Sequence, residues 1–313
     1  MSNTMLTPNA RLLQGPPSSG ASGLLLLSAD TPNTWKVSTL LEELELPYDV
    51  QLIDISADEQ KQPWYMALNP NGRTPTLIDR GDGQQAPFSV FESGAILLYL
   101  ADKYRERLAE KGLGALLPSH NEAMLRSEVE QWLMWQMSAL GPMLGNAMYF
   151  KRIAAPVIED LDALQFGLGR YERESLRLLG VLEERLVGGS PREYLCGPGR
   201  GEYSLADIAC FHYCDAGWWA GLDSQIATMP NLQQWLKRLR DRAAIQRGLC
   251  VPNGGESFRT AVTSEAAAKR DAVEANAKRA GRPHFGWRDI AEIEGRKNPR
   301  KLSSENTSPK WSP

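Results

Sequence analysis

Four short apolar segments and two amphipathic stretches follow one another in a fixed order between residues 23 and 104 of this 313-residue chain. The apolar segments have the length and the flanking turn residues of strands, and they cover 23–28, 48–54, 74–79 and 87–90. In 35–46 and 92–104 the apolar residues instead recur every three or four positions, which is the spacing of one helix face. The sequence therefore predicts the order strand, helix, strand, and then strand, strand, helix.

This order is that of a thioredoxin-like α/β domain, in which helices cover a small sheet, and we assign it to residues 23–106. Strand signals then stop, and the remaining periodicity predicts an all-α domain over residues 107–250. Its helical patterns cover 121–150, with an interruption at Gly141-Pro142, then 160–186 and 231–249. A further helix begins at the capping box of Ser204 and Asp207.

The two ends of the chain lie outside these domains. Residues 1–22 are rich in Pro, Ser, Gly and Asn, which predicts a flexible leader. Residues 251–313 form a C-terminal extension in which 261–280 has high helix propensity but little apolar face. Within it, 285–293 contains apolar residues suited to docking on the domain, and we expect the last dozen residues to be disordered.

Composition and charge limit the class of protein. Apolar residues make up 42% of the chain and charged residues 23%, near the averages of soluble globular proteins. The net charge of −3 argues against general nucleic-acid binding, which needs a basic face. No apolar run approaches the length of a membrane span, and the N-terminus lacks the pattern of a secretory signal. We therefore expect a cytoplasmic protein that binds neither nucleic acid nor membrane.

The placement of the cysteines is the most discriminating feature. All four, Cys196, Cys210, Cys214 and Cys250, lie outside the thioredoxin-like domain. A redox dithiol or a catalytic cysteine at the start of its first helix is thereby excluded, so any thiol handled there must come from a ligand. Cys210 and Cys214 lie four residues apart on one helix, but no fourth ligand is near in sequence. Buried structural thiols are favoured over a metal site, and no metal is expected.

Polar residues at the start of the first helix are suited to binding such a thiol. Thr31 and Asn33 lie where backbone N–H groups are free, so the helix dipole and side-chain donors there would stabilise a thiolate. The simpler interpretation is that Thr31 or Asn33 only caps the helix.

Two further segments are suited to the rest of a peptide-like ligand. Pro75 follows a polar loop and suits a cis peptide bond, which would present the backbone of Thr74 to the ligand. An ordinary trans proline is the alternative. Glu92 and Ser93 begin a helix whose free N–H groups would hold a carboxylate, and here too capping is the alternative.

In this order and spacing, the segments resemble the glutathione-transferase superfamily over about residues 23–249. The resemblance is greatest to the nu-class and yeast-nitrogen-regulator-like branch, which includes bacterial glutathione disulfide-bond oxidoreductases and many fungal proteins, and it suggests a fungal member. It is carried by TPNTWKVSTLLEELELPYDV, EQKQPWYMALNPNGRTPTLID, FESGAILLYLADKY, GPMLG, GRYERESLRLLGVLEERL and GEYSLADIA. It implies the glutathione-transferase fold.

The resemblance also implies that glutathione is the co-substrate and assigns a role to individual residues. Asn33, with Thr31 nearby, would be catalytic and would face the glutathione sulfur in place of the usual Tyr, Ser or Cys. Thr74, before Pro75, would pair its backbone with the cysteinyl part, although Val or Ile is usual at Thr74.

The same resemblance assigns the outer parts of glutathione. Glu92 and Ser93 would hold its γ-glutamyl amine and carboxylate. Gln60 corresponds to a further contact position, and Arg170 to a helical-domain arginine that reaches towards the active site. The resemblance implies a homodimer as well, in which the N-terminal domain of one subunit contacts the helical domain of the other.

Three functions are compatible with these residues. The first is an enzyme that conjugates glutathione thiolate to a small hydrophobic electrophile, including a substrate of secondary metabolism. The second is glutathione-dependent disulfide reduction. The third is a non-catalytic regulatory protein like the yeast nitrogen regulator, whose hallmark is an Asn/Gln-rich leader. Residues 1–22 contain only Asn3, Asn9 and Gln14 of these types, which disfavours the third function.

Overall fold

The computed structural model describes residues 23–81, 87–155, 158, 160–187, 189 and 191–252. Both predicted domains lie within one compact unit, Met1–Phe258. The predicted leader 1–22, most of the turn between the last two predicted strands, and the predicted features of the extension at 261–280 and 285–293 lie outside the described residues.

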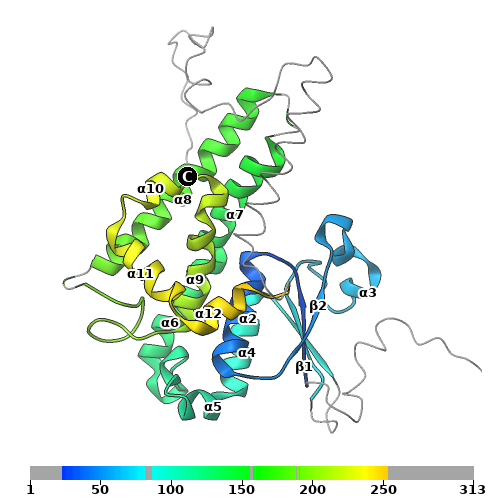
Figure 1. Cartoon of the computed structure of the whole chain (residues 1–313), viewed down its shortest axis with the longest axis vertical. Coiled ribbons are helices and arrows are strands. Elements are labelled where there is room, and N and C mark those ends of the chain that lie inside the picture. The colour runs from blue at the N-terminus through cyan, green and yellow to red at the C-terminus, as the bar shows by residue number, and fades with distance from the viewer. Residues whose placement is uncertain are drawn as a thin grey trace, which may run out of the picture. The chain divides into compact units, whose positions relative to one another are not determined.

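A four-stranded mixed sheet has the strand order β2-β1-β3-β4 (Figure 1). The strands are β1 (Leu24–Ser28), β2 (Asp49–Leu52), β3 (Thr76–Asp79) and β4 (Phe88–Phe91), as the sequence predicts. β1 pairs in parallel with β2 and antiparallel with β3, which pairs antiparallel with β4. The central strands β1 and β3 are buried along their whole length because both faces of the sheet are covered, which explains why their sequences are continuous apolar runs.

Successive leucines of β1 divide between the two faces of the sheet, since side chains alternate along a strand. Leu24 and Leu26 join the main core with α2 (Pro32–Leu44) and α4 (Ser93–Lys103). Leu25 and Leu27 join a smaller core with Tyr65 of α3 (Pro63–Met66). Figure 1 shows α2 and α4 on one face and α3 on the other. The four-residue helix α3 is too short to leave a periodic signal in the sequence.

The rest of the described chain is helical, as predicted. The α-helices are α5 (Arg105–Glu110), α6 (Ala123–Trp135), α7 (Gly141–Tyr149), α8 (Leu161–Val187), α9 (Leu205–Asp215), α10 (Asp223–Ile226), α11 (Pro230–Arg240) and α12 (Ala243–Leu249). Short 3₁₀ helices cover Ile55–Ala57, Glu59–Lys61, Gly114–Leu116, His120–Glu122 and Ala216–Ala220. Ser204 and Asp207 form the predicted capping box, in which a carboxylate oxygen of Asp207 accepts from the Ser204 N–H at 3.0 Å.

Two details of the helical domain differ from the sequence prediction. The expected interruption at Gly141-Pro142 is wrong, because a π-helical segment, Gln136–Leu140, joins α6 directly to α7, so the helical backbone continues through Pro142. The π segment changes the hydrogen-bond spacing just before Pro142, which has no N–H to bond to the preceding turn. The single helix expected over 231–249 is divided into α11 and α12. Arg242 is extended at this break (φ −77°, ψ 126°), and its guanidinium pairs with Glu43 of α2 at 2.8 Å.

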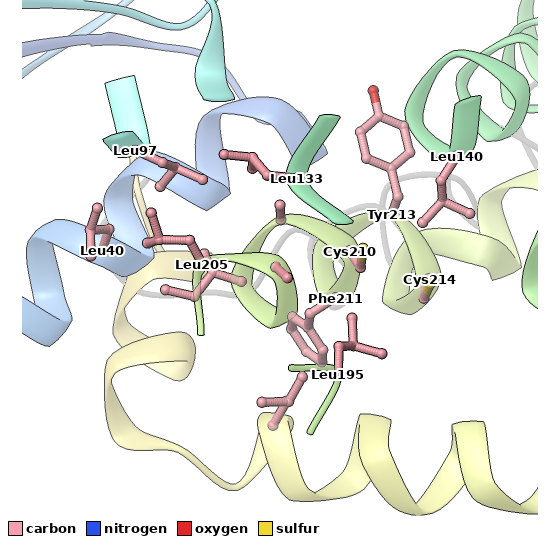
Figure 2. Close-up of a cluster of buried hydrophobic side chains, with 14 of the residues drawn as sticks. Leu40, Leu97, Leu133, Leu140, Leu195, Leu205, Cys210, Phe211, Tyr213 and Cys214 are labelled. Carbon is pink, nitrogen blue, oxygen red and sulfur yellow. The ribbon is translucent and has the colours of Figure 1, made fainter. Parts of the chain in front are cut away.

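One continuous core connects the two domains. Leu40 of α2 and Leu97 of α4 lie beside Leu205 of α9 (Figure 2), and α2 packs on α9. Cys210 and Cys214 are buried free thiols, as predicted; Cys196 is a buried free thiol too, and burial raises the pKa of each. In the described part of the chain, no helix is both long and apolar enough to span a membrane.

α12 packs on α2 as well. The hydroxyl of Ser38 donates to the carbonyl oxygen of Gly248 at 2.8 Å. A Cβ atom at Gly248 would lie 2.7 Å from the backbone nitrogen of Thr39, so only glycine allows this contact. The helix that carries Thr31 and Asn33 is therefore held by contacts with both α9 and α12.

Candidate functional site

The strand register brings the three predicted ligand-binding segments to one end of the sheet. Thr76 of β3 lies opposite Leu27 of β1 and Phe91 of β4, so the end of β1, the start of β3 and the end of β4 are adjacent. The loop to α2 follows β1, and α4 begins directly after β4. Together with the residues that precede β3, these segments lie at this end of the sheet. The segments that meet there are 31–34, 72–75 and 92–93.

At the start of α2, the structure separates the roles of Thr31 and Asn33. Thr31 is the N-cap residue, with extended backbone, and it forms a capping box with Thr34. The simpler interpretation of Thr31 is thus correct as far as the helix is concerned. Asn33 lies in the first turn, and its amide oxygen accepts a hydrogen bond from the Lys36 ammonium at 2.8 Å.

Two polar side chains form hydrogen bonds with the segment before β3. The hydroxyl of Tyr65 and the amide of Asn69 donate to the carbonyl oxygen of Arg73 at 2.8 and 2.6 Å. The next peptide bond, Thr74–Pro75, is cis, as predicted. These contacts fix the backbone of Thr74 at the end of the sheet.

Gln60 lies next to the same segment. Gly72 has a φ of +59°, which glycine adopts readily, and a Cβ there would lie only 3.0 Å from the carbonyl oxygen of Gln60, so the two loops approach each other closely. The amide oxygen of Gln60 is buried and has no hydrogen-bond partner within the described ranges. A buried acceptor left unpaired is costly, and a ligand donor would relieve that cost.

Glu92 and Ser93 form the third segment. Glu92 is the N-cap residue of α4 and has φ 70° and ψ 117°, a conformation that non-glycine residues rarely adopt and that is often found at functional sites. Its carboxylate accepts from the side-chain amide of Asn71 at 3.0 Å and remains exposed. The Ser93 hydroxyl is buried below it and lies 3.3 Å from the Lys36 ammonium.

Lys36 is a site residue that the sequence analysis missed. Its side chain is fully buried, and its ammonium donates to Asn33, to Ser93, and to the amide oxygen of Gln136 at 2.7 Å. Burial lowers the pKa of Lys36 to about 7, against the opposing charges of Cys210 and Glu92. A signal was present in the sequence, because Lys36 stands four residues before Leu40 in the apolar stripe of α2.

In the described part of the chain, no contact joins Arg170 to the other predicted site residues. It is exposed on α8, where its charge helps to lower the pKa of Glu174 on the same helix. Its predicted role stays a prediction.

The site offers hydrogen-bond donors and positive charge, and it has no thiol of its own. The starts of α2 and α4 place the positive ends of two helix dipoles here, and Lys36 supplies a cation behind them. Among the described residues, no three His, Cys, Asp or Glu side chains cluster as metal ligands would. Such a site suits an anionic, peptide-like ligand that brings its own thiol.

Known proteins are similar to this chain in sequence and in fold. Residues 31–103 match the family model for the glutathione S-transferase N-terminal domain. Disulfide-bond oxidoreductase YfcG of Escherichia coli is 38% identical over 233 residues, which are 74% of this chain and 96% of that protein.

Two solved structures are similar over most of the described chain. A glutathione transferase of Burkholderia graminis, with two glutathione molecules bound per subunit, has a TM-score of 0.65 and 39% identity, covering 76% of this chain and 92% of that one. A glutathione transferase of Pseudomonas putida, with one glutathione disulfide bound per subunit, has a TM-score of 0.63 and 35% identity, covering 75% and 94%.

These similarities confirm the expected branch with its disulfide-bond oxidoreductases, but they do not support the suggestion of a fungal member, because the three proteins are bacterial. The match extends over more than nine tenths of the length of these relatives and includes both the sheet with its converging polar segments and the helical domain. The chain belongs to the glutathione S-transferase family.

Proposed function

We propose that this protein is a glutathione-dependent enzyme that binds glutathione as a thiolate beside Asn33 and Thr31 and transfers its sulfur to an electrophile. The observation that carries the proposal is the convergence of segments 31–34, 72–75 and 92–93 at one end of the sheet, with the buried ammonium of Lys36 between Asn33 and Ser93. Two of these segments are helix starts, which favour anions.

Glutathione has charges and a peptide backbone that match the three segments. The exposed carboxylate of Glu92 is placed to pair with the γ-glutamyl ammonium, and the Ser93 hydroxyl with the neighbouring carboxylate. The backbone of Thr74, before the cis peptide to Pro75, is proposed to pair with the cysteinyl part. We assign the unpaired amide oxygen of Gln60 to a donor of glutathione, and Arg170 to contacts near the active site.

The proposed chemistry needs a thiolate and no protein nucleophile. Thr31, Asn33 and the helix start are neutral donors that stabilise negative charge on sulfur, while the proton is released to solvent. The thiolate then attacks an electrophilic carbon, a carbon–sulfur bond forms, and the leaving group departs with the bonding electrons. A small hydrophobic electrophile is the proposed partner, and a specialised biosynthetic substrate falls in the same chemical class.

Disulfide reduction is the second candidate function. In this reaction the bound thiolate attacks a small disulfide, which yields a mixed disulfide and a free thiol. A second glutathione then displaces the other thiol and leaves as glutathione disulfide. The reaction is favoured by the absence of cysteine from the thioredoxin-like domain, by the activity in the name of YfcG, and by the two glutathione molecules or the glutathione disulfide in the relatives. We place either activity in the cytoplasm, where free thiols persist.

Titration with glutathione in a calorimeter tests the proposal. We expect saturable binding by the wild-type protein, and turnover in at least one of two assays, conjugation of chlorodinitrobenzene or reduction of a small disulfide coupled to glutathione reductase. Absence of any saturable binding would contradict the proposed function. Binding without turnover in either assay would instead favour a specialised biosynthetic substrate or a regulatory glutathione-binding protein.

A further inference from the structure

Tyr213 lies on α9 in the helical domain, close to the residues proposed to face the glutathione sulfur. Only 8% of its surface is exposed, and its hydroxyl points away from the apolar side chains around α9 (Figure 2). The GPMLG segment of α7 lies in contact with the ring. A Cβ at Gly141 would lie 3.5 Å from the ring of Tyr213, and one at Gly145 would lie 3.7 Å from its hydroxyl oxygen.

The phenol contacts the thioredoxin-like domain at the predicted binding segments. The ammonium of Lys36 lies 5.0 Å from the centre of the Tyr213 ring. Asn33, as a hydrogen-bond partner, and Arg73, through its charge, both oppose the rise in the pKa of the phenol that burial causes, so both lie near it. The hydroxyl of Tyr213 is therefore next to Asn33 and towards the loop that precedes Thr74.

The chemistry of Lys36 sets the direction of these hydrogen bonds. An ammonium group can only donate, so Asn33 must turn its amide oxygen towards Lys36, as the 2.8 Å contact shows. The amide nitrogen of Asn33 then points away from Lys36 and is the group of this side chain that can donate to the oxygen of Tyr213. A phenol that accepts in this way keeps its own O–H free for a third partner.

We propose that Tyr213 donates its O–H to the sulfur of bound glutathione and acts as a third donor beside Asn33 and Thr31, with Lys36 as the positioning residue that orients Asn33. The inference rests on the proposed function, since it requires the sulfur to lie at Asn33. Burial raises the pKa of Tyr213 to about 12, against the hydrogen bond from Asn33 and the charge of Arg73, so the phenol is protonated at neutral pH. It is therefore a donor and not a base.

The substitution Tyr213→Phe removes the hydroxyl and keeps the ring in contact with Gly141 and Gly145. The test measures the pKa of the bound glutathione thiol from the ultraviolet absorbance of the thiolate as a function of pH. We expect Tyr213→Phe to lower the thiolate fraction at a given pH below that pKa about tenfold, the effect of one lost hydrogen bond to a charged group. Its dissociation constant for S-methylglutathione, which has no thiolate, is expected to match that of the wild-type protein.

Tyr203→Phe is the matched control. Tyr203 is also 8% exposed, but its ring lies 3.8 Å from the Arg242 guanidinium, outside the predicted binding segments. We expect this variant to leave the thiol pKa unchanged. The inference is overturned if Tyr213→Phe binds glutathione with the wild-type thiol pKa. Failure of the wild-type protein to bind glutathione would overturn the proposed function as well, and the two failures are distinguished by that titration.

Discussion

The ammonium of Lys36 lies 2.8 Å from the amide oxygen of Asn33 and 3.3 Å from the hydroxyl of Ser93. One buried cation thus connects the two helix starts that are proposed to bind opposite ends of glutathione. It also donates to Gln136 of the helical domain at 2.7 Å. The site is therefore organised across both domains, although its proposed contacts with glutathione come mainly from the thioredoxin-like one.

The stability of the protein is expected to depend on pH through Lys36. Burial lowers the pKa of Lys36 from 10.5 to about 7 in the folded protein, so the unfolded chain binds more protons between these values. The free energy of unfolding contributed by Lys36 therefore rises as pH increases through this range, by about 2–3 kcal/mol between about pH 7 and about pH 9.

Urea unfolding of wild type and Lys36→Met across this pH range checks the prediction. The difference between the two free energies of unfolding should change with pH in favour of the wild-type protein. Lys237→Met is the control, because the Lys237 side chain is 75% exposed and its removal should give a curve parallel to the wild type. Parallel curves for Lys36→Met as well would show that Lys36 does not titrate in this range.

Glu92→Gln should weaken glutathione binding. The substitution keeps the size of the side chain and removes the charge proposed to pair with the γ-glutamyl ammonium, so the free energy of binding should become less favourable by about 1–3 kcal/mol. Calorimetric titration measures this change. Glu106→Gln, an exposed position on α5, should bind like wild type. Equal affinities for Glu92→Gln and wild type would remove Glu92 from the proposed contacts.

Gly248→Ala should destabilise the fold. The added Cβ would lie 2.7 Å from the backbone nitrogen and 2.8 Å from the Cα of Thr39, and these atoms cannot move aside without shifting α2. We expect a loss of about 1–3 kcal/mol in the free energy of unfolding. The control, Gly180→Ala on α8, meets nothing within 4 Å and should gain about 0.5–1 kcal/mol. Urea unfolding that shows the same change for both variants would contradict the docking of α12 on α2.

We predict a homodimer, in which the N-terminal domain of one subunit contacts the helical domain of the other. Each domain has exposed apolar side chains suited to such a contact, for example Phe88 of β4 and Met134 of α6. Light scattering at micromolar concentration should give twice the mass of the 34.7 kDa chain. A monomer mass would rule the dimer out.

The sheet, and the end of the sheet where the candidate site lies, could be predicted from the sequence because local patterns determine them. The continuous apolar run of β1 indicates a strand covered on both faces, and the strand order then brings Thr31, Pro75 and Glu92 together. Lys36 was missed because a charged residue in an apolar stripe gives no hint of its partners, and Gln136 lies 100 positions further along the chain. The break at Arg242 was missed for a similar reason, since the ion pair with Glu43 spans 199 positions.

The central claim is that the thiol chemistry depends on Asn33 and on glutathione, and on no cysteine of the protein. Its most direct test measures the rate of small-disulfide reduction, with conjugation of chlorodinitrobenzene alongside, for Asn33→Ala and for a variant with all four cysteines replaced. We expect disulfides to be turned over more readily than the generic electrophile. Asn33→Ala should stay folded and lose about tenfold or more in both rates, as the thiolate loses a donor, while the cysteine-free variant should retain nearly wild-type rates. Loss of activity in the cysteine-free variant together with full activity in Asn33→Ala would contradict the claim.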